Sequence, residues 1–452
     1  MRSQRWTALI LVAPLSFLLW GFFQIYHKSS AYGTVADKLP VERAAAKRQG
    51  IPLTPEDLIR TPPVPSAQNA APLYREITAS LQQMQPASWD GVRPVILNQA
   101  TEADRRMTRL LLDQYRSIME RAEQASRLQD CDFQRDWKLG VNVPFPEYSY
   151  LRQIVRLYAA QATLQCDTNQ PLNAFHSLLI AARIARHMGQ DSCVNSLMTR
   201  AMMASTIDRP LIRTIQIYGN RSETLQLATQ IEELIGEPFD LEKGLRGECV
   251  VRLQTLTLLR KNDPHALAPG YAPLYPPHAS KQIVLDAWEV HCLSYWRGLM
   301  SGVSSVEGDP METYRVVKAA TVTENAEIVG VRKHLKPTYE MSPQLESDYS
   351  DVAQRLVVIE ARHRLRQTLI GLLAYRLQKG QFPEKLTELK PLPPEDPFAR
   401  QPLHYRKTKT GFLLYSVGIN LADDNGDGGS RIRGGDPPDI VIAFPPTRLG
   451  GG

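Results

Sequence analysis

The 452-residue sequence lacks the signatures by which most catalytic sites are recognised. It has no G-x-S-x-G nucleophile turn, no Walker phosphate loop and no G-x-G-x-x-G at the start of a helix. Its nine histidines are scattered, and none belongs to an H-E-x-x-H pair. His291 and Cys292 are adjacent, so on a helix they point about 100° apart and do not by themselves form a base–nucleophile pair. We therefore expect no enzyme. The alternative is a hydrolase whose Ser or Cys meets a histidine only in the folded chain.

Cysteine is scarce, and no two cysteines form a C-x-x-C pair, which gives no support to a zinc or thioredoxin-like site. The five are Cys131, Cys166, Cys193, Cys249 and Cys292. Cys166 and Cys193 would lie at opposite ends of a predicted helix, about 25 Å apart, whereas a disulfide needs a Cα separation of about 4.4–6.8 Å. We expect most of these thiols to be buried as small hydrophobes.

The sequence also lacks any block of consecutive Lys or Arg that would follow a phosphate backbone. Its net charge of +6 is spread along the chain, so we expect no nucleic-acid partner. An apolar fraction of 43% is enough for substantial cores, which argues against global disorder.

One long apolar run stands at the N-terminus. Arg2 and Arg5 precede the uncharged stretch Trp6–Phe23, which as a helix would span roughly 27 Å, close to the thickness of a bilayer core. We predict a retained signal-anchor over residues 1–28, which crosses the bilayer through residues 6–23. The alternative is a cleaved signal peptide, whose apolar core is usually about 7–15 residues long. In either reading the basic N-terminus stays in the cytoplasm and the remainder is exported. The retained anchor makes the chain a single-pass protein of a bacterial inner membrane, with its bulk on the periplasmic side.

Residues 29–72 contain a short predicted helix at 41–49 and then closely spaced prolines, which favour an extended conformation. We expect a stalk there. Residues 73–340 repeat apolar residues at helical spacing, with short connections such as Asp167–Pro171. This pattern predicts a bundle or a TPR-like array, with helices at 150–166 and 172–189 and a following helix that is capped by Ser192 and reaches Asp208.

A long helix is predicted from about residue 345 to 379, with an apolar face and Gly380 as its C-cap. That face consists of Leu365, Leu369, Leu372 and Leu373. The following motifs are, in order, Gly380-Gln381-Phe382-Pro383, Asp396-Pro397-Phe398, Pro402-Leu403-His404-Tyr405, Leu414-Tyr415-Ser416-Val417-Gly418, an acidic glycine-rich loop at Asp423–Gly429, and Asp439-Ile440-Val441.

This order of motifs resembles the globular domain of the major pseudopilin of bacterial type II secretion. The resemblance covers about residues 350–445. It implies a small α+β domain over residues 345–446, with a long helix, an antiparallel sheet and a calcium-binding loop, and with no catalytic apparatus. The chain lacks the short basic leader with which pseudopilins begin, so we do not expect it to polymerise as they do.

The acidic loop has alternating oxygen side chains followed by glycine, as in half of a calcium loop. An EF-hand would need Glu at the twelfth position, where this sequence has Gly434. The resemblance instead implies calcium ligands from both sides of the loop. These are Asp423, Asn425 and Asp427, with Asp436 or Asp439, and Asn420 or Asp424 as substitutes. The alternative is a solvated turn, since Asp, Asn and Gly also turn a chain.

The sequence therefore predicts a mainly α protein with a membrane anchor, a multi-helix domain and a small α+β pseudopilin-like domain. We expect a structural or interaction role with a protein partner in the envelope, in a secretion-related assembly. The alternative is a periplasmic ligand-binding protein with an aromatic groove in its helical domain. That groove would be lined by Tyr271, Tyr275, Trp288, Tyr295 and Trp296.

Overall fold

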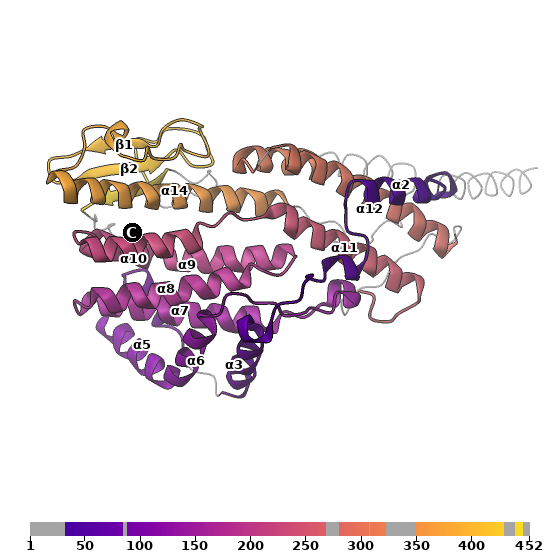
Figure 1. Cartoon of the computed structure of the whole chain (residues 1–452), viewed down its shortest axis with the longest axis horizontal. Coiled ribbons are helices and arrows are strands. Elements are labelled where there is room, and N and C mark those ends of the chain that lie inside the picture. The colour runs from indigo at the N-terminus through magenta and orange to yellow at the C-terminus, as the bar shows by residue number, and fades with distance from the viewer. Residues whose placement is uncertain are drawn as a thin grey trace, which may run out of the picture.

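The computed structural model describes residues 32–84, 88–267, 280–306, 308–321, 349–428 and 439–445. Within these ranges the protein is mainly helical, with one small antiparallel sheet near the C-terminus (Figure 1). The apolar run at residues 6–23 lies outside them. Among the described helices, none has the length and apolar content needed to cross a membrane.

The helices of the first half are α2 (Leu39–Arg48), α3 (Ala71–Gln83), α4 (Val92–Ile96), α5 (Glu102–Gln114), α6 (Arg116–Ser126), α7 (Pro146–Asp167) and α8 (Pro171–Met188). Then come α9 (Val194–Tyr218), α10 (Ser222–Ile235), α11 (Leu241–Arg260), α12 (Lys281–Ser305), a helix over 310–321, and α14 (Ser350–Lys379). The strands are β1 (His404–Lys407), β2 (Phe412–Ser416) and β3 (Ile440–Phe444).

Several helix ends follow from local sequence. Thr101 caps α5, where its hydroxyl accepts a hydrogen bond from the Asp104 amide at 3.2 Å while the Asp104 carboxylate accepts one from the Thr101 amide at 2.8 Å. Pro146 and Pro171 occupy the first positions of α7 and α8, where no amide donor is needed. Gly380 ends α14 with a φ of 78°, which confirms the predicted C-cap.

One prediction at a helix start was wrong. The cap of α9 is Cys193 rather than Ser192, and the Cys193 sulfur accepts a hydrogen bond from the Ser196 amide at 3.4 Å. The helix also continues to Tyr218, past the predicted end. Four of the five thiols are buried and Cys292 is half-buried, as expected of small hydrophobes.

The predicted helical hairpin is present as α7 and α8, which pack against each other and against α9. Their apolar stripes form the centre of the largest buried cluster, where Leu151, Phe175 and Leu178 are fully enclosed. Helices α3, α6 and α10 cover this centre from other sides. The helical region is thus built on α7, α8 and α9.

The C-terminal segment is not separated from this core. Helix α14 lies between the sheet and helices α9 and α10 (Figure 1). Its residues Leu365 and Leu369 belong to the same buried cluster as the bundle helices and as Leu414 and Ile442 of the sheet. The predicted boundary near residue 340 therefore does not divide two cores, because α14 has buried residues in contact with both neighbours.

The sheet has the strand order β1-β2-β3, and both pairs are antiparallel. Leu414 in the central strand faces Tyr405 in β1 and Ile442 in β3. Phe382, which follows α14, makes edge contacts with Phe412 and Phe444 at centroid distances of 4.9 and 5.3 Å. These rings join the sheet to the end of the long helix.

Part of the stretch predicted to be an extended stalk packs against the body of the protein. Leu39, Ala46 and Ile51 pack into a second buried cluster with residues of α11 and α12. Two ion pairs, Arg43–Glu289 and Arg297–Glu42, each at 2.5 Å, tie α2 to α12. This stretch lies along the body because its apolar and charged side chains find partners there.

A close approach at Gly247 in α11 leads to a first prediction. A Cβ at this position would lie 1.5 Å from the Ser192 carbonyl oxygen, so α11 and the start of α9 would have to separate. We expect Gly247→Ala to lower the free energy of unfolding by about 1–3 kcal/mol, measured by urea denaturation. Gly298→Ala in α12 is the matched control, because its Cβ would meet nothing within 4 Å. The control should gain up to about 1 kcal/mol in helix propensity. Equal effects of the two substitutions would contradict the close packing at Gly247.

Candidate metal centre

The acidic loop follows β2 and returns beside the start of β3. Pairing of β2 with β3 places Ser416 opposite Ile440, so Asp439 comes next to the loop that leaves β2. The loop turns through left-handed backbone at Gly418, Asn425 and Gly426, with φ values of 66°, 61° and 79°. Glycine and asparagine are the residues that adopt this conformation most readily.

Asp423 is held in place from three sides. Its Oδ1 accepts hydrogen bonds from the Tyr415 hydroxyl at 3.0 Å and from the Asn425 amide at 2.8 Å. Its Oδ2 lies 3.5 Å from Nδ1 of His404, a ring that stacks on Tyr415 at a centroid distance of 4.7 Å. The pKa of Asp423 is lowered, chiefly by the Asn425 amide. This carboxylate is therefore ionised and oriented.

Asp439 has one satisfied and one unsatisfied oxygen. It is 4% exposed, and its Oδ2 accepts a hydrogen bond from the Gly426 amide at 2.8 Å. Its Oδ1 is buried and has no hydrogen-bond partner among the described residues. Burial raises the pKa of Asp439, the amides of Gly426 and Asp424 oppose this shift, and the nearby charges of Asp424 and Asp423 add to it. A buried carboxylate oxygen without a donor is a position that a cation would stabilise.

The five predicted ligands have different surroundings in the structure. Asp439 accepts from the main-chain amide of Gly426, and Asp423 accepts from the main-chain amide of Asn425, which orients it. The Asp427 amide donates to the Asp424 carbonyl oxygen at 3.2 Å. Asp436 lies outside the described residues. The described part of the chain holds no group of three or more His, Cys, Asp or Glu side chains placed to bind a metal.

The two proposed substitutes are paired with each other. The Asn420 amide group donates to Oδ2 of Asp424 at 2.9 Å, and the Asn420 side-chain oxygen accepts from the Ala422 amide at 3.1 Å. This arrangement holds the outer part of the loop near Asp423. Carboxylate, amide and main-chain oxygens are the ligands that Ca²⁺ takes, so the donor types fit calcium.

Asp396 supports the loop, a role not predicted from the sequence. It is completely buried, and its carboxylate accepts hydrogen bonds from the Phe398 amide at 3.0 Å, the Ser416 hydroxyl at 2.8 Å and the Val417 amide at 2.9 Å. These bonds fix the Asp396-Pro397-Phe398 turn to the last residues of β2, where the acidic loop begins. An Asp-Pro turn followed by an aromatic residue was the available signal, but its partner on β2 could not be inferred.

The aromatic residues proposed for a ligand groove serve packing where they are described. Trp296 is 1% exposed and contacts Tyr295 and Tyr349 at centroid distances of 5.4 and 5.6 Å. The Arg252 guanidinium lies 5.6 Å from the Trp296 ring centroid. Trp296 therefore belongs to a core rather than to an open groove. Tyr271 and Tyr275 are outside the described residues.

Comparison of this chain with protein-family models, curated proteins and solved structures finds no match.

Proposed function

We propose that this chain is a membrane-anchored, exported interaction protein whose C-terminal helix and sheet bind Ca²⁺ at the acidic loop. The unsatisfied Oδ1 of buried Asp439 is the observation that carries the calcium site. Asp423 or Asp424 would complete the carboxylate set, with main-chain oxygens of the loop as further ligands. The anchor would be the apolar stretch at residues 6–23.

The arrangement of the chain supports a presenting role. The sheet lies at one end of the elongated molecule and α2, the first labelled helix after the apolar run, lies at the other (Figure 1). An anchor before α2 would hold the sheet away from the bilayer, toward a protein partner in the envelope. Bound calcium would join the loop to β3 and reduce the entropy lost when a partner binds this surface. This non-catalytic role follows the resemblance of the C-terminal motifs to the pseudopilin domain.

Thermal or chemical unfolding of the whole protein tests the calcium site. At a calcium concentration about 100 times Kd, the free energy of unfolding should rise by about 2.7 kcal/mol relative to chelator-treated protein. Asp439→Asn should abolish this response. It should cost little stability in chelator, because the amide oxygen can still accept from Gly426 and no charge is buried.

Asp90→Asn is the matched control, because Asp90 is an exposed residue between α3 and α4. This variant should respond to calcium as the unsubstituted protein does. An unchanged midpoint for the unsubstituted protein in millimolar Ca²⁺ would contradict the metal site and leave the loop as a hydrogen-bonded turn. The whole chain is used because α14 shares its core with the bundle.

A further inference from the structure

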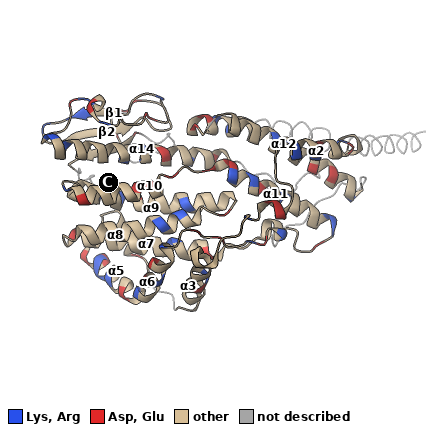
Figure 2. Ribbon diagram, in the orientation of Figure 1, with Lys and Arg blue, Asp and Glu red and all other residues tan. Residues whose placement is uncertain are grey.

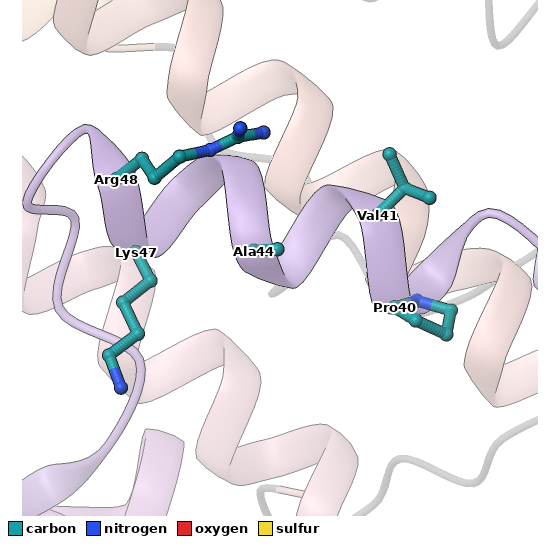
Figure 3. Close-up of a pocket in the computed structure, with 5 residues that line it drawn as sticks. All are labelled: Pro40, Val41, Ala44, Lys47 and Arg48. Atoms are coloured by element: carbon teal, nitrogen blue, oxygen red, sulfur yellow. The ribbon is translucent and has the colours of Figure 1, made fainter.

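Helix α2 has an exposed stripe that its partners in the body leave uncovered. Pro40, Val41, Ala44, Lys47 and Arg48 recur at the spacing of one helix face and line a shallow hollow of about 660 Å³ (Figure 3). Val41 is 65% exposed, the most exposed large apolar side chain among the described residues. The stripe is therefore apolar along one part and basic at its end.

The opposite face of α2 is fully engaged. Leu39 and Ala46 are buried against α11 and α12, and both signs of charge occur where α2 and α12 lie together (Figure 2). Glu42 is paired with Arg297, and Arg43 is paired with Glu289. Lys47 and Arg48 of this helix and Lys38 at its N-cap are exposed basic groups, as is the paired Arg43, and Asp37 and Asp57 are the acidic groups beside them.

We infer that this stripe rests on the anionic surface of the membrane into which the chain is anchored, an inference that depends on the proposed anchor. The apolar run ends at Phe23 and α2 begins at Leu39. The connection would reach at most about 50 Å if fully extended, and residues 32–36 are helical, which shortens it. Helix α2 is thus tethered near the bilayer surface.

The chemistry of the stripe fits lipid headgroups. Basic side chains beside exposed apolar ones are typical of helices that lie in the interface, with the apolar groups at the headgroup boundary and the cations on anionic lipids. The shallow shape of the hollow suits an extended surface better than a small ligand, which is usually enclosed. Docking of the stripe would leave α12 and α11 on the side of α2 that faces away from the membrane.

The test places a fluorescent thiol label at Val41→Cys in the full-length chain, reconstituted in vesicles with or without phosphatidylglycerol. The unsubstituted protein is the blank for the native thiols, four of which are buried. Quencher-carrying lipids should quench the label severalfold more in phosphatidylglycerol vesicles than in neutral ones, and high salt should reduce the difference. Lys409→Cys, an exposed position at the β1–β2 turn, is the matched control and should not be quenched.

Charge reversal with Lys47→Glu and Arg48→Glu should remove most of the quenching at Val41. An alkaline wash of the same vesicles reports the anchor separately. Retained protein without quenching at Val41 would overturn the docking of α2 and leave the anchor intact. Release of the protein by the wash would overturn the anchor and this inference together. Equal shielding of the label in neutral vesicles and in detergent would show that a protein segment covers the stripe, which also overturns the inference.

Discussion

Replacing Arg366 with methionine should lower the free energy of unfolding by about 3–5 kcal/mol. Arg366 lies in α14, is 3% exposed and reaches two acidic residues of the bundle. Its Nε donates to Glu232 of α10 at 2.7 Å and its Nη2 donates to the same carboxylate at 3.0 Å. Its Nη1 donates to Asp208 of α9. Removal of the guanidinium would leave two buried carboxylates with too little compensating charge.

The remaining members of this cluster show why the loss would be large. Arg362 donates to the other oxygen of Asp208 at 2.7 Å, and Nδ1 of His363 lies 2.6 Å from Glu232. Burial alone would raise the pKa of Asp208, but the guanidinium groups of Arg366 and Arg362 outweigh burial and lower it. Asp208 is therefore a buried anion, and both arginines stabilise its charged form.

Arg355→Met is the control, since Arg355 is exposed on the same helix. This substitution should change the free energy of unfolding by less than about 0.5 kcal/mol. Urea denaturation measures both variants. The same measurement on Glu232→Gln, and on Arg366→Met combined with Glu232→Gln, gives the coupling energy between Arg366 and Glu232. The double variant should lose less than the sum of the single losses, because the buried negative charge is removed with its partner. A loss below about 1 kcal/mol for Arg366→Met would show that the cluster does not hold α14 on the bundle.

The long helix illustrates what the sequence predicts and what it leaves open. Its stripe of leucines predicted a buried face because apolar residues recur at helical spacing. Arg362 and Arg366 have the spacing of an exposed charged face, and the partners of Arg366 lie 134 and 158 residues away in the sequence. Pairings between distant segments leave no local pattern. The packing of α2 on α12 was not predicted for the same reason, because these helices are also distant in the sequence.

The candidate site was predictable to a similar extent. Asp423 could be named because alternating oxygen side chains are a local feature, and Asp439 because the resemblance to pseudopilins implies a ligand from the far side of the loop. The burial of Asp439 beneath the loop depends on the β2–β3 register, which the sequence alone does not specify. The fixing of the loop by Asp396 depends on a contact with Ser416, twenty residues further along the chain.

The second large effect concerns acid stability and His187 in α8. His187 is 2% exposed, and its Nε2 lies 3.0 Å from the Leu128 carbonyl oxygen, which can only accept. Nε2 therefore carries the proton, and Nδ1 accepts from the Tyr74 hydroxyl at 2.9 Å. Burial lowers the pKa of His187 to about 4, although the Leu128 carbonyl opposes this shift. Protonation in the folded protein would put a charge on the buried ring and would require the Tyr74 hydroxyl to change from donor to acceptor.

The sign of the effect follows from the two protonation states. Above pH of about 6.5 the ring is neutral in both folded and unfolded chains, so its contribution to stability is fully present. Between about pH 6.5 and 4 the unfolded chain binds a proton that the folded chain does not, and stability falls by about 1.4 kcal/mol per pH unit. His187 alone should therefore cost about 3 kcal/mol by pH 4.

Urea denaturation at several pH values isolates this contribution by comparison of the protein with His187→Gln. Buried carboxylates such as Asp191, whose pKa is raised by burial, affect both proteins equally. The difference in free energy between the two proteins should narrow by about 3 kcal/mol from pH 7 to pH 4, because glutamine does not titrate. His176→Gln, at an exposed position of the same helix, should leave the acid-dependent slope nearly unchanged. A constant difference in the free energy of unfolding between the protein and His187→Gln across this range would mean that the pKa of His187 is not lowered in the folded chain. In the Tyr74–His187 hydrogen bond, Nδ1 would then be the donor and the Tyr74 hydroxyl oxygen the acceptor.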